Sequence, residues 1–138
     1  MPGEKPYPQI LVDAEELYGL LLTAETMMTK VDKIRYNNRA VDQILDVIKE
    51  FVLAYDFEDD REIHLKRMCA NVTVFIRTMR IINDRNIIHV FNPLESEKPD
   101  SVKMKIMEHL GKLDEGATRW KNSIINSRNK GTSGIAKQ

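Results

Sequence analysis

The sequence predicts an all-α protein that folds as an antiparallel, up-down-up-down four-helix bundle. Four stretches carry large apolar residues at alternating steps of three and four, the spacing of a helix face packed on other helices. Short polar breaks separate these stretches, and no strand pattern competes with them. The chain has 138 residues, 42% of them hydrophobic, which suits one domain. We expect a loose arm over residues 1–8, the bundle over 9–126 and a disordered basic tail over 127–138.

The first predicted helix runs from about Gln9 to Val31. Its core-facing positions are Ile10, Ala14, Leu17, Leu21, Ala24, Met28 and Val31. Asp13 followed by Glu16 is typical of a capping box, if the helix begins later than Gln9. Further apolar residues lie off this face, which predicts burial against a second surface such as another subunit.

The second predicted helix follows a polar break that ends in Asn37 and Asn38, and it runs to about Tyr55. Its predicted core positions are Val41, Ile44, Ile48, Phe51 and Tyr55. In the acidic turn that follows, Asp59 and Glu62 favour a capping box over a metal site. The turn lacks the spaced ligands and the glycine of a calcium loop.

The third predicted helix, from about Asp60 to Asp84, has the clearest pattern. Its apolar seam is Leu65, Met68, Val72, Phe75, Met79 and Ile82. The opposite side is small, polar and mostly basic, with Lys66, Arg77 and Arg80. The helix therefore offers one face to a core and a basic face to something else.

The fourth predicted helix begins near Asp100, after a loop over 92–100. The short apolar run 87–91 before that loop predicts a last helical turn or an extended cover for one end of the bundle. The helix face is carried by Val102, Ile106, Leu110, Leu113, Ala117, Trp120 and Ile124. Gly111 and Gly116 predict either a close helix approach or a bend.

Composition excludes several classes of protein. No run approaches the ~18 apolar residues of a membrane span, and the N-terminus has no apolar signal core. The lone Cys69 fits a reducing compartment, so we expect a cytoplasmic protein that does not bind membranes. Net charge is zero, but residues 1–60 sum to −7 and residues 61–138 to +7. This asymmetry indicates either ordinary solvated faces or a basic surface for an anionic partner.

No motif for catalysis, a cofactor or a metal stands out. A Gly-rich phosphate loop, a Cys pair and a His-Glu-x-x-His helix are all missing from the sequence, and we predict no cofactor and no metal. One enzyme reading remains as a lesser alternative. Arg85 and His89 come near the Arg and His pair of a bundle-type ribonuclease, although they are closer together than that family usually shows.

The basic residues are the most informative candidates for function. Lys30, Lys33, Arg35 and Arg39 cluster between the first two predicted helices, and Lys66, Arg77 and Arg80 share the outer side of the third. A phosphate backbone attracts such charges without a fixed spacing. We therefore predict that these seven residues bind nucleic acid.

Several short motifs, spread over residues 14–124, resemble the accessory variability proteins of diversity-generating retroelements. They are Leu17-Tyr18 in the first helix, the basic junction from Lys30 to Arg39, Leu65-Lys66-Arg67 with Phe75 to Arg80 in the third helix, and Trp120 to Ser123 in the fourth. The chain is also similar to the small bundle proteins encoded in intervening sequences of large-subunit ribosomal RNA genes.

The resemblance implies a four-helix bundle assembled as a homopentameric ring. It implies a non-catalytic accessory protein that binds a reverse transcriptase and nucleic acid, RNA or DNA, and supports mutagenic cDNA synthesis. It also implies contacts from Arg35, Arg39, Arg77 and Arg80, which match basic positions of the family. The alternative is a protein-interaction scaffold or adaptor bundle that does not bind nucleic acid.

Overall fold

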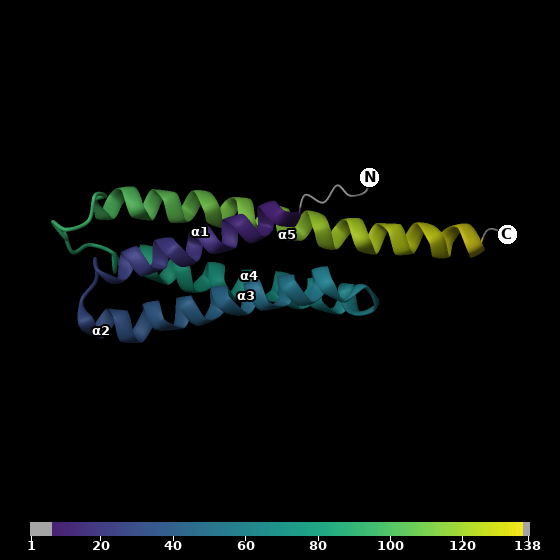
Figure 1. Cartoon of the computed structure of the whole chain (residues 1–138), viewed down its shortest axis with the longest axis horizontal. Coiled ribbons are helices and arrows are strands. Elements are labelled where there is room, and N and C mark those ends of the chain that lie inside the picture. The colour runs from purple at the N-terminus through teal and green to yellow at the C-terminus, as the bar shows by residue number, and fades with distance from the viewer. Residues whose placement is uncertain (1–6, 137–138) are drawn as a thin grey trace.

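The computed structural model describes residues 7–136, with side chains over 9–129, and within that range the protein is all-helical. Four long helices are present and no strand occurs in the described part, which is consistent with a helical bundle (Figure 1). The long helices are α1 (Tyr7–Glu25), α3 (Asn38–Asp56), α4 (Arg61–Asp84) and α5 (Pro99–Ala136). The single turn α2 (Lys30–Asp32), a π-helical turn (Lys33–Asn37) and a 3-10 turn (Glu58–Asp60) lie in the connections.

The connections gather at two ends of the molecule (Figure 1). The segment from α1 to α3 and the loop from α4 to α5 lie at one end, which we call the junction end (residues 26–38 and 85–98). The turn between α3 and α4 lies at the other end, which we call the acidic end (residues 56–60). The C-terminal part of α5 continues beyond the acidic end (Figure 1).

The first helix ends earlier than predicted. α1 stops at Glu25, and the predicted core residue Val31 lies in α2 with 56% of its surface exposed. Threonine hydroxyls explain the break, because they offer the backbone alternatives to helical hydrogen bonds. The Thr26 hydroxyl donates to the Thr23 carbonyl (2.7 Å), and Thr29 Oγ1 accepts from the Asp32 N–H at the start of α2 (3.2 Å). The other six predicted core positions of this helix are buried.

The core face of α3 agrees with the prediction at Ile44 and Phe51 and is shifted by one residue at its other three positions. Its buried apolar residues are Ala40, Ile44, Val47, Phe51 and Ala54. The predicted core residues Val41, Ile48 and Tyr55 are only partly buried, at the edge of the core. Two apolar stripes of helical spacing therefore run along α3, and only one of them is buried.

The helix α4 matches its prediction closely, and all six seam residues are buried. It ends in a Schellman motif, in which the N–H of Ile87 donates to the Ile82 carbonyl and that of Asn86 to the Asn83 carbonyl. Asn86 has a φ of 50°, which asparagine tolerates better than most residues. The predicted capping box of Asp59 and Glu62 is wrong, because Asp59 lies inside the 3-10 turn and the N-cap of α4 is Asp60, which makes no side-chain cap bond. Glu62 pairs instead with Lys66 and Arg128.

The segment after α4 covers the junction end. Ile87 and Ile88 are buried, and the N–H groups of His89 and Val90 both donate to the Met27 carbonyl (2.9 and 2.8 Å). The predicted cover for one end of the bundle is therefore confirmed in its extended form. It ties the α4–α5 loop to the segment that follows α1.

The helix α5 is longer than predicted. It continues through residue 126 to Ala136, so residues 127–136 of the predicted disordered tail are helical, while 137–138 lie outside the described residues. The predicted arm over 1–8 lies mostly outside the described residues too, and α1 begins at Tyr7. Near the acidic end of the molecule, Trp120 of α5 packs on Phe51 of α3 with ring centroids 5.5 Å apart.

Candidate nucleic-acid interface and buried histidine pairs

Six of the seven predicted nucleic-acid-binding residues lie toward the junction end. Lys30, Lys33 and Arg35 belong to the connection from α1 to α3, Arg39 to the first turn of α3, and Arg77 and Arg80 to the last turns of α4. All six side chains are exposed. The start of α3 and the end of α4 meet at this end (Figure 1), so the fold brings residues forty positions apart toward one region.

Lys66 is the exception. It lies near the start of α4, fourteen residues before Arg80, which is about 21 Å along a helix. Its ammonium pairs with Glu62 at 3.1 Å. The structure therefore does not bring Lys66 to the other six residues.

These six residues, which lie in or next to the junction end, form no ion pair with any residue whose side chain the structure describes. By contrast, three lysines of α5 form ion pairs within their own helix or with the loop before it: Lys103 with Asp100, Lys105 with Glu97 and Lys112 with Glu108. Unpaired surface cations keep their full charge for an external anion, and no internal partner must be displaced when one binds.

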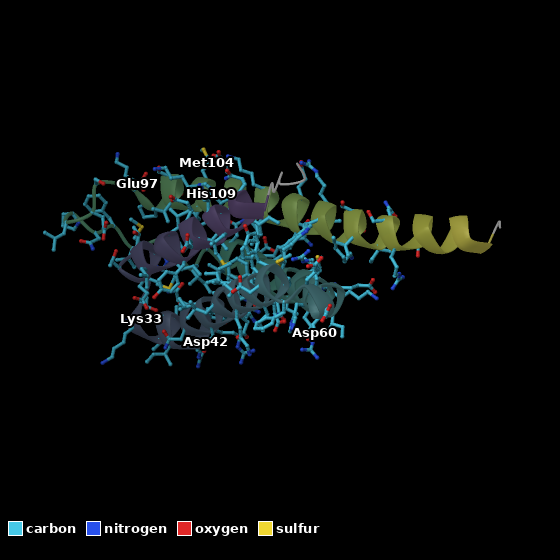
Figure 2. All side chains as sticks on the ribbon, turned by 45° about the vertical axis from the view of Figure 1, so that its right-hand side comes forward. Lys33, Asp42, Asp60, Glu97, Met104 and His109 are labelled. Atoms are coloured by element: carbon cyan, nitrogen blue, oxygen red, sulfur yellow. The ribbon has the colours of Figure 1, made fainter. Side chains whose placement is uncertain are left out.

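The two ends of the molecule carry opposite charge. The junction end together with the adjoining turns of α3 and α4 (residues 26–42 and 77–98) contains eight lysines and arginines against five aspartates and glutamates. The acidic end carries Asp56, Glu58, Asp59 and Asp60, all exposed. Figure 2 shows Lys33 and Asp60 at opposite ends of the helices. Such a dipolar distribution orients an approaching polyanion toward the junction end.

A buried asparagine holds the basic connection in place. Asn37, at the end of the π-helical turn, is fully buried, and its Nδ2 donates to the Leu21 carbonyl of α1 at 3.1 Å. Tyr36 beside it is partly buried against the core. These two anchors leave Lys33, Ile34 and Arg35 on the outside of the turn. π-helical turns often occur at functional sites.

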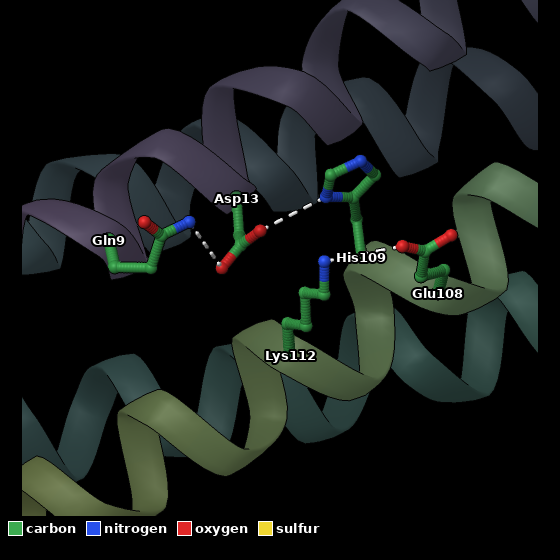
Figure 3. Close-up of polar contacts among 5 residues, drawn as sticks. All are labelled: Gln9, Asp13, Glu108, His109 and Lys112. Atoms are coloured by element: carbon green, nitrogen blue, oxygen red, sulfur yellow. Dashed lines mark hydrogen bonds and ion pairs between the residues drawn. The ribbon is translucent and has the colours of Figure 1, made fainter.

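A second polar feature joins α1 to α5. Asp13 is 2% exposed, and its Oδ1 lies 3.0 Å from His109 Nδ1 (Figure 3). Gln9 Nε2 donates to the other carboxylate oxygen at 3.4 Å. Asp13 thus acts as a buried partner for a histidine, and the predicted capping box with Glu16 is wrong because Asp13 lies inside α1.

His109 borders an open cavity of about 440 Å³ between α1 and the first half of α5. Its ionisable lining residues are Glu15, Glu16, Glu97, Lys105 and His109. Lys105 and Glu97 form an ion pair with each other. A carboxylate at Nδ1 orients an imidazole and fixes its tautomer, which leaves Nε2 available for proton transfer. Among the described residues, no three metal-ligating side chains come together.

A second histidine pair joins α3 to α4. His64 Nδ1 lies 2.7 Å from Glu50 Oε1, and both side chains are largely buried. Neither histidine pair was predicted from the sequence. The available signal was a carboxylate at a core-facing position of each helix, Asp13 beside Ala14 and Glu50 beside Phe51, because a buried carboxylate requires a partner.

The ribonuclease pattern lies just beyond α4. Arg85 is the C-cap residue of that helix, and His89 Nδ1 lies 3.1 Å from the Ile87 carbonyl oxygen. Both side chains are exposed at the junction end. No described contact joins them, and the catalytic alternative stays a prediction.

The single cysteine, Cys69, lies at the contact between α4 and α5. Cys69 is partly buried, and its Sγ donates to the Ala117 carbonyl of α5 at 3.4 Å. Burial raises the pKa of the Cys69 thiol, against a lowering by Lys121, with a further rise from Asp114. A thiol with a raised pKa is a poor nucleophile near neutral pH.

No helix in the described part of the chain is long and apolar enough to cross a membrane. Comparisons of the chain with family models, with curated proteins and with solved structures gave no match.

Proposed function

We propose that this protein is a non-catalytic accessory protein of a diversity-generating retroelement, which binds its reverse transcriptase and RNA or DNA and supports mutagenic cDNA synthesis. The proposal begins from the sequence resemblance to the accessory variability proteins. In it, the protomer is an antiparallel up-down-up-down bundle, the assembly is a homopentameric ring, and the protein acts in the cytoplasm.

One observation carries the nucleic-acid part of the proposal. Lys30, Lys33, Arg35, Arg39, Arg77 and Arg80 are exposed toward one end, and none forms an ion pair with a residue whose side chain is described. A ring would repeat this weak patch in every subunit. Repeated contacts raise avidity without any new chemistry.

The test measures binding of a fluorescent single-stranded RNA by anisotropy at stepped salt concentrations. We expect binding that weakens steeply with salt. The logarithm of the association constant should fall with the logarithm of the salt concentration by a slope of about 0.7 for each phosphate contact. Lys33→Glu/Arg35→Glu and Arg77→Glu/Arg80→Glu are expected to weaken binding and flatten the slope. Lys112→Glu/Arg119→Glu is the matched control, because both bases are exposed on α5 and paired with Glu108 and Glu115.

The reverse transcriptase is tested separately. The purified protein is added to its polymerase in a primer-extension reaction on a template repeat, and the cDNA is sequenced. We expect an increase in misincorporating synthesis with the protein and no synthesis by the protein alone. RNA affinity that is unchanged by both junction-end variants would refute the proposed interface.

A protein-only scaffold is the second candidate, and exposed apolar residues on α3 and α4 favour it. A scaffold predicts partner binding that survives Arg77→Glu/Arg80→Glu and an absence of salt-sensitive RNA binding. The same anisotropy series therefore separates the two functions.

A further inference from the structure

The cavity beside His109 runs along one continuous face of α1. Three residues line it from the other side, Glu97 of the loop and Lys105 and His109 of α5. The lining residues of α1 recur at the spacing of neighbouring helical turns: Val12, Glu15, Glu16, Gly19, Leu20 and Thr23. We call this cavity the α1–α5 groove. Its volume of about 440 Å³ lies in the range of pockets that hold small ligands.

Gly19 lies in the middle of this face and leaves space there. The backbone does not require a glycine, because Gly19 lies inside α1 and no glycine in the described part of the chain has a positive φ. Packing does not require one either, since an added Cβ would meet nothing within 4 Å. A glycine inside a helix costs about 1 kcal/mol relative to alanine. Gly19 therefore keeps the groove open at a cost in helix stability.

The carboxylates of Glu15 and Glu16 bring negative charge to the groove, and no base neutralises it. Neither residue forms an ion pair with a residue whose side chain the structure describes. α1 contains four acids and no lysine or arginine. Lys105, the one lysine among the lining residues, is already paired with Glu97. Two unpaired carboxylates on one wall of a cavity favour a cationic ligand.

The pair of Asp13 and His109 adds a third hydrogen-bond acceptor. Asp13 Oδ1 lies 3.0 Å from His109 Nδ1, so in the neutral imidazole Nδ1 carries the proton and Nε2 is an acceptor. Figure 3 shows the second ring nitrogen turned away from Asp13. Because Asp13 is buried, the orientation of the imidazole at the edge of the groove is held from below.

We infer that the α1–α5 groove binds an alkyl guanidinium, either that of a small organic cation or that of an arginine side chain. A guanidinium presents five N–H donors in one plane and no acceptor, which suits a groove whose free polar groups are acceptors. It is more weakly hydrated than an ammonium, so it enters a partly apolar site at a lower cost. Val12 and Leu20 provide apolar contact for the alkyl stem beside the open space at Gly19.

The inference goes beyond the proposed function and does not rest on it. The groove lies between α1 and α5, whereas the basic residues of the junction end lie on α3, on α4 and on the connection before α3. Figure 2 shows His109 and Lys33 on different sides of the molecule. The two surfaces therefore attract ligands of opposite charge.

The test titrates the full chain with 1-butylguanidinium chloride by isothermal titration calorimetry. We expect saturable binding of one cation per chain. N-butylurea, which has nearly the same shape without the charge, is the matched ligand control and should not bind detectably. The peptide acetyl-Gly-Arg-Gly-amide distinguishes the two sources. Tighter binding of the peptide assigns the groove to an arginine of a partner, and weaker binding assigns it to a free cation.

Two pairs of substitutions separate the groove from general attraction by acids. Glu15→Gln/Glu16→Gln removes both unpaired carboxylates and should weaken 1-butylguanidinium binding by about tenfold or more. Glu58→Gln/Asp59→Asn removes the same charge from the acidic end, where the side chains are exposed on a turn. It should leave the affinity within about twofold of the wild type.

A steric variant tests the space itself. Gly19→Leu places a side chain in the groove and should abolish binding, while circular dichroism shows a folded chain. Gly111→Leu is its matched control, because Gly111 is also exposed with open space around it and does not line the groove. It should bind as the wild type does.

Four outcomes would overturn the inference. They are the absence of saturable 1-butylguanidinium binding, equal binding of N-butylurea, an affinity that Glu15→Gln/Glu16→Gln leaves unchanged, and an equal loss in the acidic-end variant. The charge variants alter no packed side chain, since Glu15 and Glu16 are exposed. They therefore decide the question even if Gly19→Leu unfolds.

Discussion

Asp13 of α1 and His109 of α5 form a partly buried carboxylate–imidazole pair, 3.0 Å apart, between residues ninety-six positions apart in the chain. Glu50 and His64 repeat this arrangement between α3 and α4. Two pairs of neighbouring helices, α1 with α5 and α3 with α4, thus share a carboxylate–histidine contact near the core. A buried contact of this kind fixes the register of two helices, since an apolar face alone tolerates slippage.

Removal of His109 should destabilise the fold. His109→Ala leaves the Asp13 carboxylate buried without its imidazole partner, and we expect the free energy of unfolding to fall by about 1–3 kcal/mol. Urea denaturation followed by circular dichroism measures this. Lys112→Ala, three residues further along α5, removes an exposed ion pair with Glu108 and should cost less than about 0.5 kcal/mol. Equal losses in the two variants would contradict the buried role.

Asn37 and its neighbour Asn38 should respond differently to substitution. Asn37 is fully buried and donates to the Leu21 carbonyl, whereas Asn38 is exposed at the start of α3. Asn37→Ala is expected to lower the free energy of unfolding by about 1–3 kcal/mol, because the carbonyl loses its donor and a cavity remains. Asn38→Ala should lie within about 0.5 kcal/mol of the wild type. Thermal melting of the two variants side by side provides the comparison.

The two glycines of α5 differ in the space around them. At Gly111 an added Cβ meets nothing within 4 Å, whereas at Gly116 it would lie 3.1 Å from Ile10 Cγ1 of α1. Gly111→Ala should therefore stabilise the protein by about 0.5–1 kcal/mol through helix propensity. Gly116→Ala should gain less or lose stability, since Ile10 must shift. If denaturant midpoints rise equally in both, the close approach of α1 and α5 at Gly116 is wrong.

Cys69 should react slowly in the native protein. Burial raises the pKa of its thiol, so at pH 8 a smaller fraction is the reactive thiolate. Alkylation by iodoacetamide, followed by mass spectrometry, should speed up strongly in denaturant. The control places the thiol on the exposed side of the same helix, as Cys69→Ala/Thr73→Cys, and should react fast without denaturant.

The same thiol gives a pH dependence of stability. The pKa of Cys69 is raised in the folded state, so the protonated thiol contributes to the free energy of unfolding. This contribution is fully present below the thiol's unfolded-state pKa of 9.0. It is lost as pH rises through the folded pKa. Cys69→Ala should therefore lose less stability than the wild type between pH 8 and pH 10, as measured by urea midpoints.

The sequence predicted the long helices well where one apolar seam dominates. In α4 the seam from Leu65 to Ile82 has no competitor, and both its bounds and its buried face agree with the prediction. In α3 two seams interleave, one through Val47 and one through Ile48, and spacing alone gives no reason to choose between them. Contact with neighbouring helices decides which is buried.

The candidate site was only partly predictable. Proximity along the chain identified Lys30 to Arg39 as a cluster. The shared side of one helix grouped Lys66 with Arg77 and Arg80, although Lys66 lies near the other end of α4. Asp13 could be recognised as a carboxylate at a core-facing position, but its partner could not be predicted, because Asp13 and His109 meet only once α1 packs on α5. The break after α1 was missed because threonine hydroxyls, rather than proline or glycine, interrupt the helix.

The Met27 carbonyl couples the opening motions of the two connections at the junction end. It accepts the amide protons of both His89 and Val90, so the two connections at the junction end share one acceptor. Neither connection can open without breaking the bonds of the other. The amides of His89 and Val90 should therefore exchange with solvent together, at a rate close to that of the helix ends they join. The shared acceptor thus couples the two connections of the junction end, and a partner meets them in a preformed arrangement.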